Sequence, residues 1–194
     1  MDNQALKKFY DELYTKNPEV FGTSSLNFLE RIFAHISAEG TYALDVGSGA
    51  GVTSEFLAKL GFHVDAVDIS ELARKNHLSN KITWHTSSIQ NFDIRREYSF
   101  AYFALVVHHL EVNVFEEIVH KLKRHAPGGS THAYRLFTTK SDFYREGTKT
   151  FFDDGSNLNS LYEDWKIIYD ERHDSRASTT DAVNEVREVA YSSA

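Results

Sequence analysis

Hydrophobic positions recur along this chain with two different periods. In residues 3–14, and again in residues 26–36, apolar side chains stand three or four positions apart, which is the spacing of an amphipathic helix. The hydroxyls of Thr23-Ser24-Ser25 can cap the second helix, and Gly40 is expected to end it. From residue 41 onward, short apolar runs alternate with helical segments. The pattern predicts two N-terminal helices followed by alternating strands and helices.

The order of these elements defines a fold class. Alternating strands and helices imply an α/β protein whose mostly parallel sheet is covered on both faces. The last two strands have no long helix between them, so we expect an antiparallel hairpin that turns around residues 175–180. The prediction is a Rossmann-like, doubly wound sheet of seven strands, mostly parallel, with one antiparallel edge strand. The predicted strands are 41–46, 63–68, 81–86, 98–107, 131–138, 164–172 and 185–192, and the predicted helices are 51–60, 70–77, 113–125 and 157–163.

Three glycines, Gly47, Gly49 and Gly51, stand between the first predicted strand and a predicted helix. Glycine is needed there if the backbone passes through positive φ and approaches a ligand with no Cβ in between. Asp68 ends the second strand, 21 residues after Gly47, where a carboxylate can accept both hydroxyls of a ribose. Its alternative role is to cap a helix at 70–77. Together these features predict a cofactor that contains adenosine.

The glycine spacing distinguishes between classes of adenosine cofactor. Dinucleotide-binding turns follow G-x-G-x-x-G, and Val52 stands where their third glycine would be. The chain also has no convincing Tyr-x-x-x-Lys pair. A nicotinamide-dependent oxidoreductase is therefore a disfavoured alternative. Asp45, just before the turn, can meet an ammonium group of the ligand or orient backbone amides of the loop.

With these residues, the chain resembles the class I S-adenosylmethionine-dependent methyltransferases over residues 20–140. Residues 44–51 look like motif I of that superfamily, and Asp68 looks like its ribose-binding acid. Residues 86–93 look like its adenine-binding segment, and residues 98–110 look like its fourth strand and the following loop. The resemblance implies S-adenosylmethionine as the cofactor and S-adenosylhomocysteine as the product.

The resemblance also implies which residues contact the cofactor. Asp45 and Gly47 would face its methionine end, and Ile69 would pack on the adenine. Ser88 and Ser99 stand where acidic residues are common, and because a neutral hydroxyl is a weaker partner than a carboxylate, we expect weakened affinity. The expected cofactor-binding residues are Asp45, Gly47, Ser48, Gly49, Gly51, Asp68, Ile69, Ser88, Ile89 and Ala104.

Segments outside this core look like the TehB-like tellurite-resistance methyltransferases. That family implies a small, single-domain enzyme that methylates a small, electron-rich acceptor, and its best-known members act on tellurite and selenium oxyanions. The segments keep the same order along nearly the whole chain, and they are residues 14–22, 98–111, 151–152 and 161–169.

The sequence gives no sign of a second domain. It has two prolines and no repeat or linker-like change of composition. We expect one domain over residues 1–194, in which residues 1–22 form a cap and residues 23–140 form the cofactor-binding core. Residues 141–194 are expected to form the acceptor side and the edge hairpin.

Two groups of residues are candidates for chemistry at the acceptor. His108 and its neighbour His109 follow the fourth strand, and His108 is the candidate base, with packing or capping as the alternative. An oxyanion would need cationic donors, and Arg172, His173 and Arg176 resemble the family's His-Arg segment. The alternative for these three is a solvated charged turn. We expect no metal site, because the histidine pair has no further ligand at suitable spacing.

Composition limits the partners and the location. The formal net charge of −7, with no basic stripe, makes a nucleic-acid substrate unexpected. The chain has no cysteine, no apolar run approaching the roughly 20 residues of a membrane span, and an acidic, amide-rich start. We expect a cytoplasmic monomer or homodimer that acts on a small molecule. A non-catalytic cofactor-binding or partner-binding protein is the remaining alternative, suggested by Ser88 and Ser99.

Overall fold

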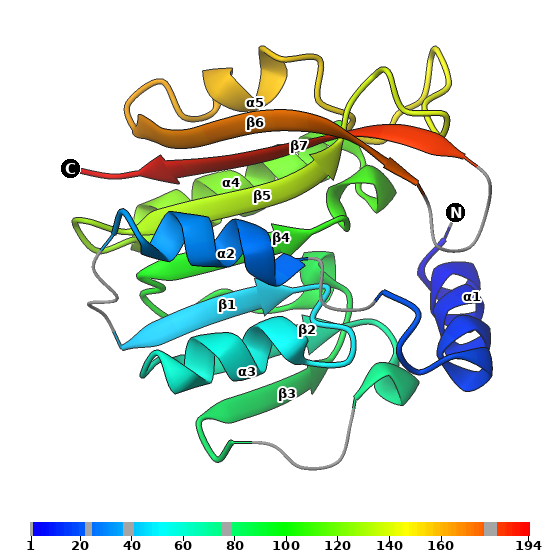
Figure 1. Ribbon diagram of the computed structural model, residues 1–194, viewed down its shortest axis with the longest axis horizontal. Helices are drawn as coiled ribbons and strands as arrows, with labels where there is room; N and C mark the ends of the chain where they lie inside the picture. Colours follow the sequence, from blue (N-terminus) through cyan, green and yellow to red (C-terminus); the bar gives the residue numbers. More distant parts are fainter. Residues whose placement is uncertain (1, 22–24, 37–40, 75–78, 177–181) are drawn as a thin grey trace.

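Seven strands form one mixed sheet in the order β3-β2-β1-β4-β5-β7-β6 (Figure 1). The computed structural model describes residues 2–21, 25–36, 41–74, 79–176 and 182–194. The strands are β1 (Tyr42–Val46), β2 (His63–Asp68), β3 (Ile82–Thr86), β4 (Phe100–Ala104), β5 (Thr131–Phe137), β6 (Lys166–Arg176) and β7 (Val183–Ser192). The helices are α1 (Asn3–Lys16), α2 (Ser25–Phe33), α3 (Val52–Lys59), α4 (Val112–His125) and α5 (Asn157–Ser160), with short 3₁₀ turns η1 (Glu71–Ala73), η2 (Ile89–Asn91) and η3 (Val107–His109).

The pairing of the strands confirms the predicted doubly wound α/β sheet. Strands β1 to β5 pair in parallel, and β7 runs antiparallel to both of its neighbours, β5 and β6. The antiparallel pair lies at one edge of the sheet, as predicted, and β7 is its inner member. The turn predicted around residues 175–180 lies, from residue 177 onward, outside the described residues.

Two hydrophobic layers hold the helices against the sheet. Successive residues of a strand point to opposite faces, so each strand serves both layers. In β4, Phe100 and Tyr102 pack in the cluster under α2 and α3, whereas Phe103 packs with Phe115 of α4 in the other cluster. Figure 1 shows α2 and α3 in front of the sheet and α4 behind it. The predicted two-sided cover is confirmed.

Two predicted elements are shorter in the structure. The strand predicted at 98–107 ends at Ala104, because Leu105 takes a φ of +50°, outside the extended region. The helix predicted at 70–77 is wrong in its described part, which is one 3₁₀ turn followed by extended Arg74. Residues 75–78 lie outside the described residues, as do Thr23, Ser24 and Gly40, the predicted cap and stop of α2.

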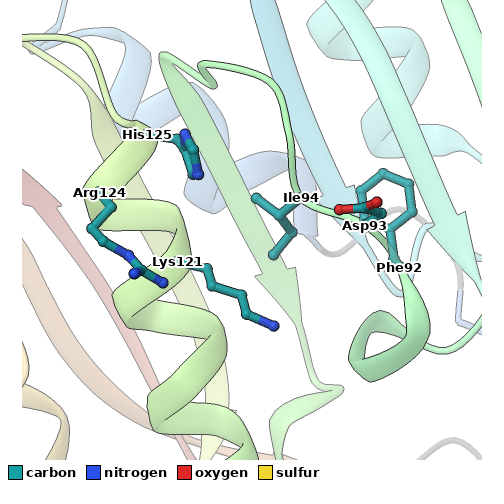
Figure 2. A pocket seen from close by; sticks show the side chains of 6 residues that line it. All are labelled: Phe92, Asp93, Ile94, Lys121, Arg124 and His125. Carbon is teal, nitrogen blue, oxygen red and sulfur yellow. The ribbon is translucent and has the colours of Figure 1, made fainter.

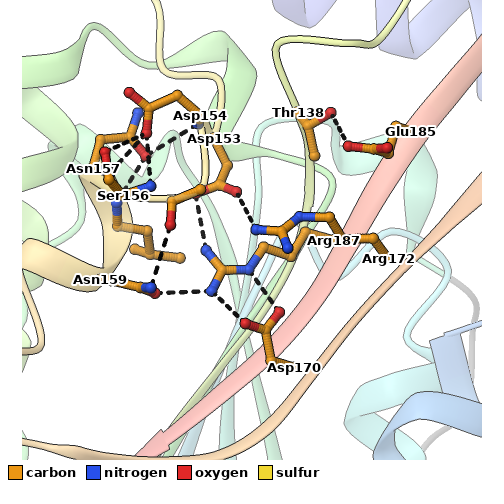
Figure 3. A network of polar contacts seen from close by, with 12 residues as sticks. Thr138, Asp153, Asp154, Ser156, Asn157, Asn159, Asp170, Arg172, Glu185 and Arg187 are labelled. Carbon is orange, nitrogen blue, oxygen red and sulfur yellow. Dashed lines mark hydrogen bonds and ion pairs between the residues drawn. The ribbon is translucent and has the colours of Figure 1, made fainter.

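A buried arginine ties the edge hairpin to the segment before α5 (Figure 3). Arg187 of β7 is fully buried, and its guanidinium donates to Asp153 at 3.0 Å and to both carboxylate oxygens of Asp170 at 2.8 Å. It also donates to Asn159 at the end of the same network. Since a buried charge is tolerated only when it is paired and hydrogen-bonded, this network fixes the position of residues 151–153 against the sheet.

Helix α1 belongs to neither layer and stands at one end of the sheet (Figure 1). Its N-cap is Asp2, whose side chain accepts the N–H of Ala5 at 2.8 Å. Leu6 and Tyr14 are its buried residues, and the helix packs mainly on η1, directly after β2. The helix therefore lies over the ends of the strands, where the predicted cofactor residues are.

Candidate functional site

The turn between β1 and α3 has the conformation that its three glycines predict. Gly47, Gly49 and Gly51 have φ values of +72°, +52° and +79°, in the region that side chains disfavour. The N–H groups of Gly47 and Ser48 donate to the carbonyl of Val67 at 2.9 and 3.1 Å, which fixes the turn against β2. The turn thus forms a backbone cradle at the carboxyl end of the parallel strands.

Two aromatic side chains occupy the space that the glycines leave. A Cβ on Gly49 would lie 2.8 Å from the hydroxyl of Tyr14, and a Cβ on Gly51 would lie 2.4 Å from the Trp84 ring. Tyr14 comes from α1 and is buried, whereas Trp84 comes from β3 and is partly buried. The close approach that requires glycine here is therefore made, in this structure, by aromatic rings of the chain itself.

Asp68 connects the tip of β2 to the glycine turn. Its Oδ2 accepts the N–H of Gly49 at 2.9 Å, and its Oδ1 accepts the N–H of Ser70 at 2.8 Å. Burial raises the pKa of Asp68, and these backbone hydrogen bonds oppose the rise. Each carboxylate oxygen uses one lone pair in these hydrogen bonds and retains a second. Asp68 therefore braces the loop and still has acceptor capacity directed at the carboxyl end of the sheet.

Asp45 lies fully buried under the glycine turn. Its Oδ2 accepts the hydroxyl of Ser54 in α3 at 2.6 Å, and among the described residues its Oδ1 has no hydrogen-bond partner. Burial raises the pKa of Asp45 to about 7. The structure thus favours loop bracing for Oδ2 and leaves one buried acceptor atom unused. Ser48 likewise has a buried hydroxyl with no partner in the described part of the chain.

The predicted adenine segment follows β3 and is bonded to α1. Ser88 precedes η2, and its hydroxyl accepts from the side-chain amide of Asn3 at 3.3 Å. Gln90 donates to the carbonyl oxygen of the same Asn3 side chain at 2.7 Å. The side chain of Ile89 is buried in the cluster under α4, whereas Ile69 and Ala104 are partly buried at the ends of β2 and β4.

Helix α1 spans the whole group of predicted cofactor residues. Beyond the Asn3 contacts, Asp11 accepts the hydroxyl of Ser70 at 2.5 Å, next to Asp68. Tyr14 lies against Gly49, and the hydroxyl of Tyr10 is 2.7 Å from Nε2 of His109. One face of α1 thus contacts the predicted adenine segment, Ser70 two residues after Asp68, the glycine turn and η3.

The two histidines of η3 are partly buried and lie among aromatic rings. The ring centroid of His108 lies 3.9 Å from that of His109, 4.8 Å from that of Phe137 and 6.1 Å from that of Phe152. Burial lowers the pKa of His109 to about 4 and holds the pKa of His108 well below its ordinary value. Both imidazoles are therefore neutral at physiological pH. Nδ1 of His108 is buried and has no hydrogen-bond partner among the described residues.

The candidate oxyanion residues lie on the edge strand β6. Arg172 points its guanidinium toward Asp153, at 3.7 Å, in the network around Arg187 (Figure 3). His173 is partly buried one residue further on, and Arg176 ends β6 with a side chain outside the described set. Asp153 directly follows Phe152, so the contacts of Arg172 and of His108 meet on neighbouring residues of one segment. The structure does not bring Arg172 into contact with the glycine turn.

Four aromatic residues of the site were not predicted as site residues. They are Trp84, Phe137, Tyr144 and Phe152. Phe137 could have been singled out, because it ends the strand predicted at 131–138 and so reaches the same edge as the glycine turn. Trp84 has no such local signal, since nothing in the sequence of β3 indicates its contact with Gly51.

A cavity of about 480 Å³ lies away from these residues (Figure 2). It opens between the segment after η2 and the last turns of α4, and it is lined by Phe92, Asp93, Ile94, Lys121, Arg124 and His125.

Within residues 2–21, 25–36, 41–74, 79–176 and 182–194, no group of three His, Asp or Glu side chains could hold a metal ion. No helix in that same set is long and apolar enough to cross a membrane.

The observed residues fit an adenosine cofactor that carries a methionine. A positive-φ cradle follows β1, an acid with free lone pairs ends β2, and an unpartnered carboxylate oxygen lies beneath the cradle. This fold and this site define a class I S-adenosylmethionine-dependent methyltransferase. The family model described as "Tellurite resistance protein TehB" matches residues 13–189, and the chain belongs to that family. The resemblance seen in the sequence is confirmed.

Known proteins of the same class are similar in fold. The crystal structure of TehB from Haemophilus influenzae has a TM-score of 0.70 at 16% identity, covering 95% of this chain and 67% of that chain. A Burkholderia thailandensis 1,6-didemethyltoxoflavin-N1-methyltransferase, crystallised with 1,6-didemethyltoxoflavin and S-adenosylhomocysteine, has a TM-score of 0.71 at 13% identity, covering 97% and 87%. The ribosomal protein L11 methyltransferase of Campylobacter concisus (strain 13826) is 45% identical over 56 residues, which are 29% of this chain and 20% of that protein. The chain thus aligns with one fifth of that relative's length.

Proposed function

We propose that this protein transfers the methyl group of S-adenosylmethionine to a small-molecule acceptor held at the carboxyl ends of β4 and β5. The observation that carries the proposal is the bond between Asp68 and the N–H of Gly49 at 2.9 Å. It joins the acid at the tip of β2 to the positive-φ turn after β1, so the ribose and methionine ends of one ligand can be held together.

The cofactor-binding residues follow from this arrangement. The backbone of Gly47, Ser48, Gly49 and Gly51 cradles the methionine end, with Asp45 beneath it. Asp68 accepts the ribose hydroxyls, Ile69, Ser88 and Ile89 surround the adenine, and Ala104 faces the cofactor from the end of β4. S-adenosylmethionine supplies a methyl group on a sulfonium, which is a good leaving group. The chain therefore has mainly to align acceptor and donor and to exclude water.

The TehB family suggests tellurite or a selenium oxyanion as one acceptor class. In that version of the proposal, Arg172, His173 and Arg176 hold the oxyanion. Arg172 would share its guanidinium with Asp153, which already lies 3.7 Å away. In the version with a proton-bearing acceptor, His108 is the base.

The absence of cysteine from the sequence is compatible with action in the reducing cytoplasm, and either a monomer or a homodimer would suffice.

Equilibrium titration with S-adenosylmethionine and with NAD tests the cofactor. We expect saturable binding of S-adenosylmethionine and none of NAD; the reverse result would overturn the proposal in favour of an oxidoreductase. Asp68→Asn should weaken S-adenosylmethionine binding by roughly 10- to 100-fold, because charge-assisted hydrogen bonds to the ribose are lost. Asp164→Asn, an exposed acid between α5 and β6, is the matched control and should bind like the wild type.

Release of S-adenosylhomocysteine against an acceptor panel separates an enzyme from a binding protein. The panel should include tellurite, selenite, thiols and small amines. S-adenosylmethionine binding with no release on any acceptor would favour the non-catalytic alternative.

A further inference from the structure

The acceptor side of the site is built almost entirely from aromatic rings. His108 and His109 of η3 are joined to Phe137 of β5 and to Tyr10 of α1 through ring contacts with centroids 4.8 and 5.6 Å apart. Phe152 lies 6.1 Å from His108 on the same side. These rings come from four separate segments and meet at the carboxyl ends of β4 and β5. Such convergence favours a ligand that is itself a flat, apolar ring.

Exposed aromatic surface continues this cluster to the outside. Three phenylalanines are exposed among the described residues, and each of them contacts the cluster. Phe143 lies 5.2 Å from Phe137, and Phe9 and Phe21 lie 5.3 and 6.2 Å from Tyr10. Single exposed phenylalanines are ordinary, but each of these three lies against a ring of the cluster. The gathering marks this end of the sheet as the entrance for an apolar molecule.

Three arginines at the same end of the sheet are already paired with carboxylates. The arginines of β5, β6 and β7 whose side chains are described each lie against a carboxylate: Arg135 against Glu188 at 3.2 Å, Arg172 against Asp153 at 3.7 Å, and Arg187 against Asp153 and Asp170. Burial keeps both imidazoles of η3 uncharged by lowering their pKa values. An oxyanion bound among these rings would lose its hydration, and it would find each of the three arginines just described already paired with a carboxylate, which is costly.

The backbone that carries the histidines is held in a strained form. Leu105, between β4 and η3, has a φ of +50°, which is rare for a residue other than glycine. Its N–H donates to the carbonyl of Arg135 at 2.8 Å, and its side chain packs on Phe137 and Phe152. Strain of this kind persists where the surroundings enforce it, often at functional sites. It turns η3 toward the aromatic cluster.

We propose that the methyl acceptor is an uncharged aromatic or heteroaromatic small molecule with an acidic O–H, S–H or ring N–H, and that His108 removes its proton. This inference rests on the proposed methyltransferase function and names the acceptor class within it. His109 already shares Nε2 with the hydroxyl of Tyr10, whereas Nδ1 of His108 has no partner in the described part of the chain. Buried polar atoms are usually hydrogen-bonded, so His108, and not His109, is the histidine of this pair that can bind a proton of the acceptor.

The proton and the charge balance in this step. The bond between the methyl carbon and the sulfonium sulfur breaks, the bond between the acceptor atom and the methyl carbon forms, and the acceptor proton moves to the imidazole of His108. The sulfonium becomes a neutral thioether as the imidazole becomes an imidazolium, so the site carries one positive charge before and after. A weakly basic imidazole matches an acidic nucleophile, which is why an aromatic hydroxyl, thiol or ring N–H is favoured over an aliphatic amine or alcohol.

Matched acceptors test the class. Wild-type protein with saturating S-adenosylmethionine should release S-adenosylhomocysteine with thiophenol at a kcat/KM at least roughly 10-fold above that with 2-mercaptoethanol, because thiophenol both gains ring contacts and has the more acidic S–H. Tellurite and selenite should react more slowly still. Faster turnover of either oxyanion, or no turnover of any neutral aromatic acceptor, would overturn the inference. A protein that fails to bind S-adenosylmethionine would instead overturn the proposed function itself.

Two variants test the residues. His108→Asn should lower kcat for the aromatic acceptor by about 100-fold or more with little change in KM, because the base is lost. Phe137→Leu should mainly raise KM for the aromatic acceptor, which keeps the inference testable even if His108→Asn folds poorly. Both should bind S-adenosylmethionine like the wild type, and His125→Asn, an exposed histidine at the distant cavity, is the control. Full kcat in His108→Asn would exclude it as the base.

Discussion

Replacing Gly51 with alanine should destabilise the protein far more than the same change at Gly129. The two glycines have nearly the same backbone conformation, with φ values of +79° and +77°. A Cβ at Gly51 would lie 2.4 Å from the Trp84 ring, whereas a Cβ at Gly129 would meet no atom within 4 Å. The two variants therefore share a conformational penalty and differ in a steric one.

The magnitudes of the two penalties can be worked out separately. The left-handed conformation costs a residue with a Cβ roughly 1–2 kcal/mol, and this is the expected loss of unfolding free energy for Gly129→Ala. At Gly51 the added methyl group must also displace the Trp84 ring or the turn, and overpacking of this kind costs about 1–3 kcal/mol. The expected loss for Gly51→Ala is then about 2–5 kcal/mol.

Urea unfolding followed by circular dichroism measures both losses. Circular dichroism suits the test because fluorescence would change when Trp84 is altered. In a Trp84→Ala background, the added methyl group at Gly51 has room, so the loss for Gly51→Ala should fall to the roughly 1–2 kcal/mol of its backbone conformation. Equal losses for Gly51→Ala and Gly129→Ala in the wild-type background would refute the steric argument. So would a large Gly51→Ala penalty that survives in the Trp84→Ala background.

Two further predictions concern buried polar groups. Arg187→Met leaves the buried carboxylate of Asp153 without its main partner, so unfolding free energy should fall by about 3–5 kcal/mol, whereas Arg95→Met at an exposed pair should leave it unchanged within the error of urea unfolding. Adding Asp153→Asn to Arg187→Met should recover part of the loss, and no recovery would argue against an uncompensated charge as its cause. Burial lowers the pKa of His132 to about 3, below the roughly 6.5 of an unfolded histidine. Between pH 3 and pH 6.5 the unfolded state therefore binds one more proton than the folded state, so the unfolding free energy rises with pH in this range. When the pH is lowered from 7 to 5, His132 should reduce the unfolding free energy of the wild type by about 2 kcal/mol. The unfolding free energy of His132→Phe, measured with urea at both pH values, should therefore fall by about 2 kcal/mol less than that of the wild type.

The glycine turn and the acid beside it could be predicted from the sequence because their signals are local. The turn of Gly47, Gly49 and Gly51 needs positive φ values that only glycine adopts freely, and the residue spacing alone indicates this. Asp68 ends a strand parallel to the one before the turn, so the two meet at one edge in any sheet of this order. The helix predicted at 70–77 failed for a related reason: Asp68 uses one oxygen to bind the N–H of Ser70, and the chain continues as a short 3₁₀ turn.

The acceptor side could not be predicted in the same way, because its contacts join distant parts of the chain. Tyr10 and His109 are bonded across 99 residues, and no local pattern pairs them. Arg172 was predicted as a candidate oxyanion ligand, and its contact with Asp153, set by the register of β6 and the course of the segment before α5, is one that no local pattern indicates. The sequence does not distinguish an arginine in a solvated turn from an arginine in an ion pair, since the partner of the arginine depends on which segment packs beside its strand.

The sequence by itself determined the α/β sheet, the glycine turn, the position of its acid and the class of cofactor, because periodicity and backbone conformation are properties of short segments. Only the tertiary structure decided what surrounds that turn. It laid Tyr14 and Trp84 against the glycines, paired Arg135 and Arg172 with carboxylates and placed Phe137 and Phe152 around His108. These outcomes depend on packing between elements far apart in the chain, and they shape the environment that a methyl acceptor meets.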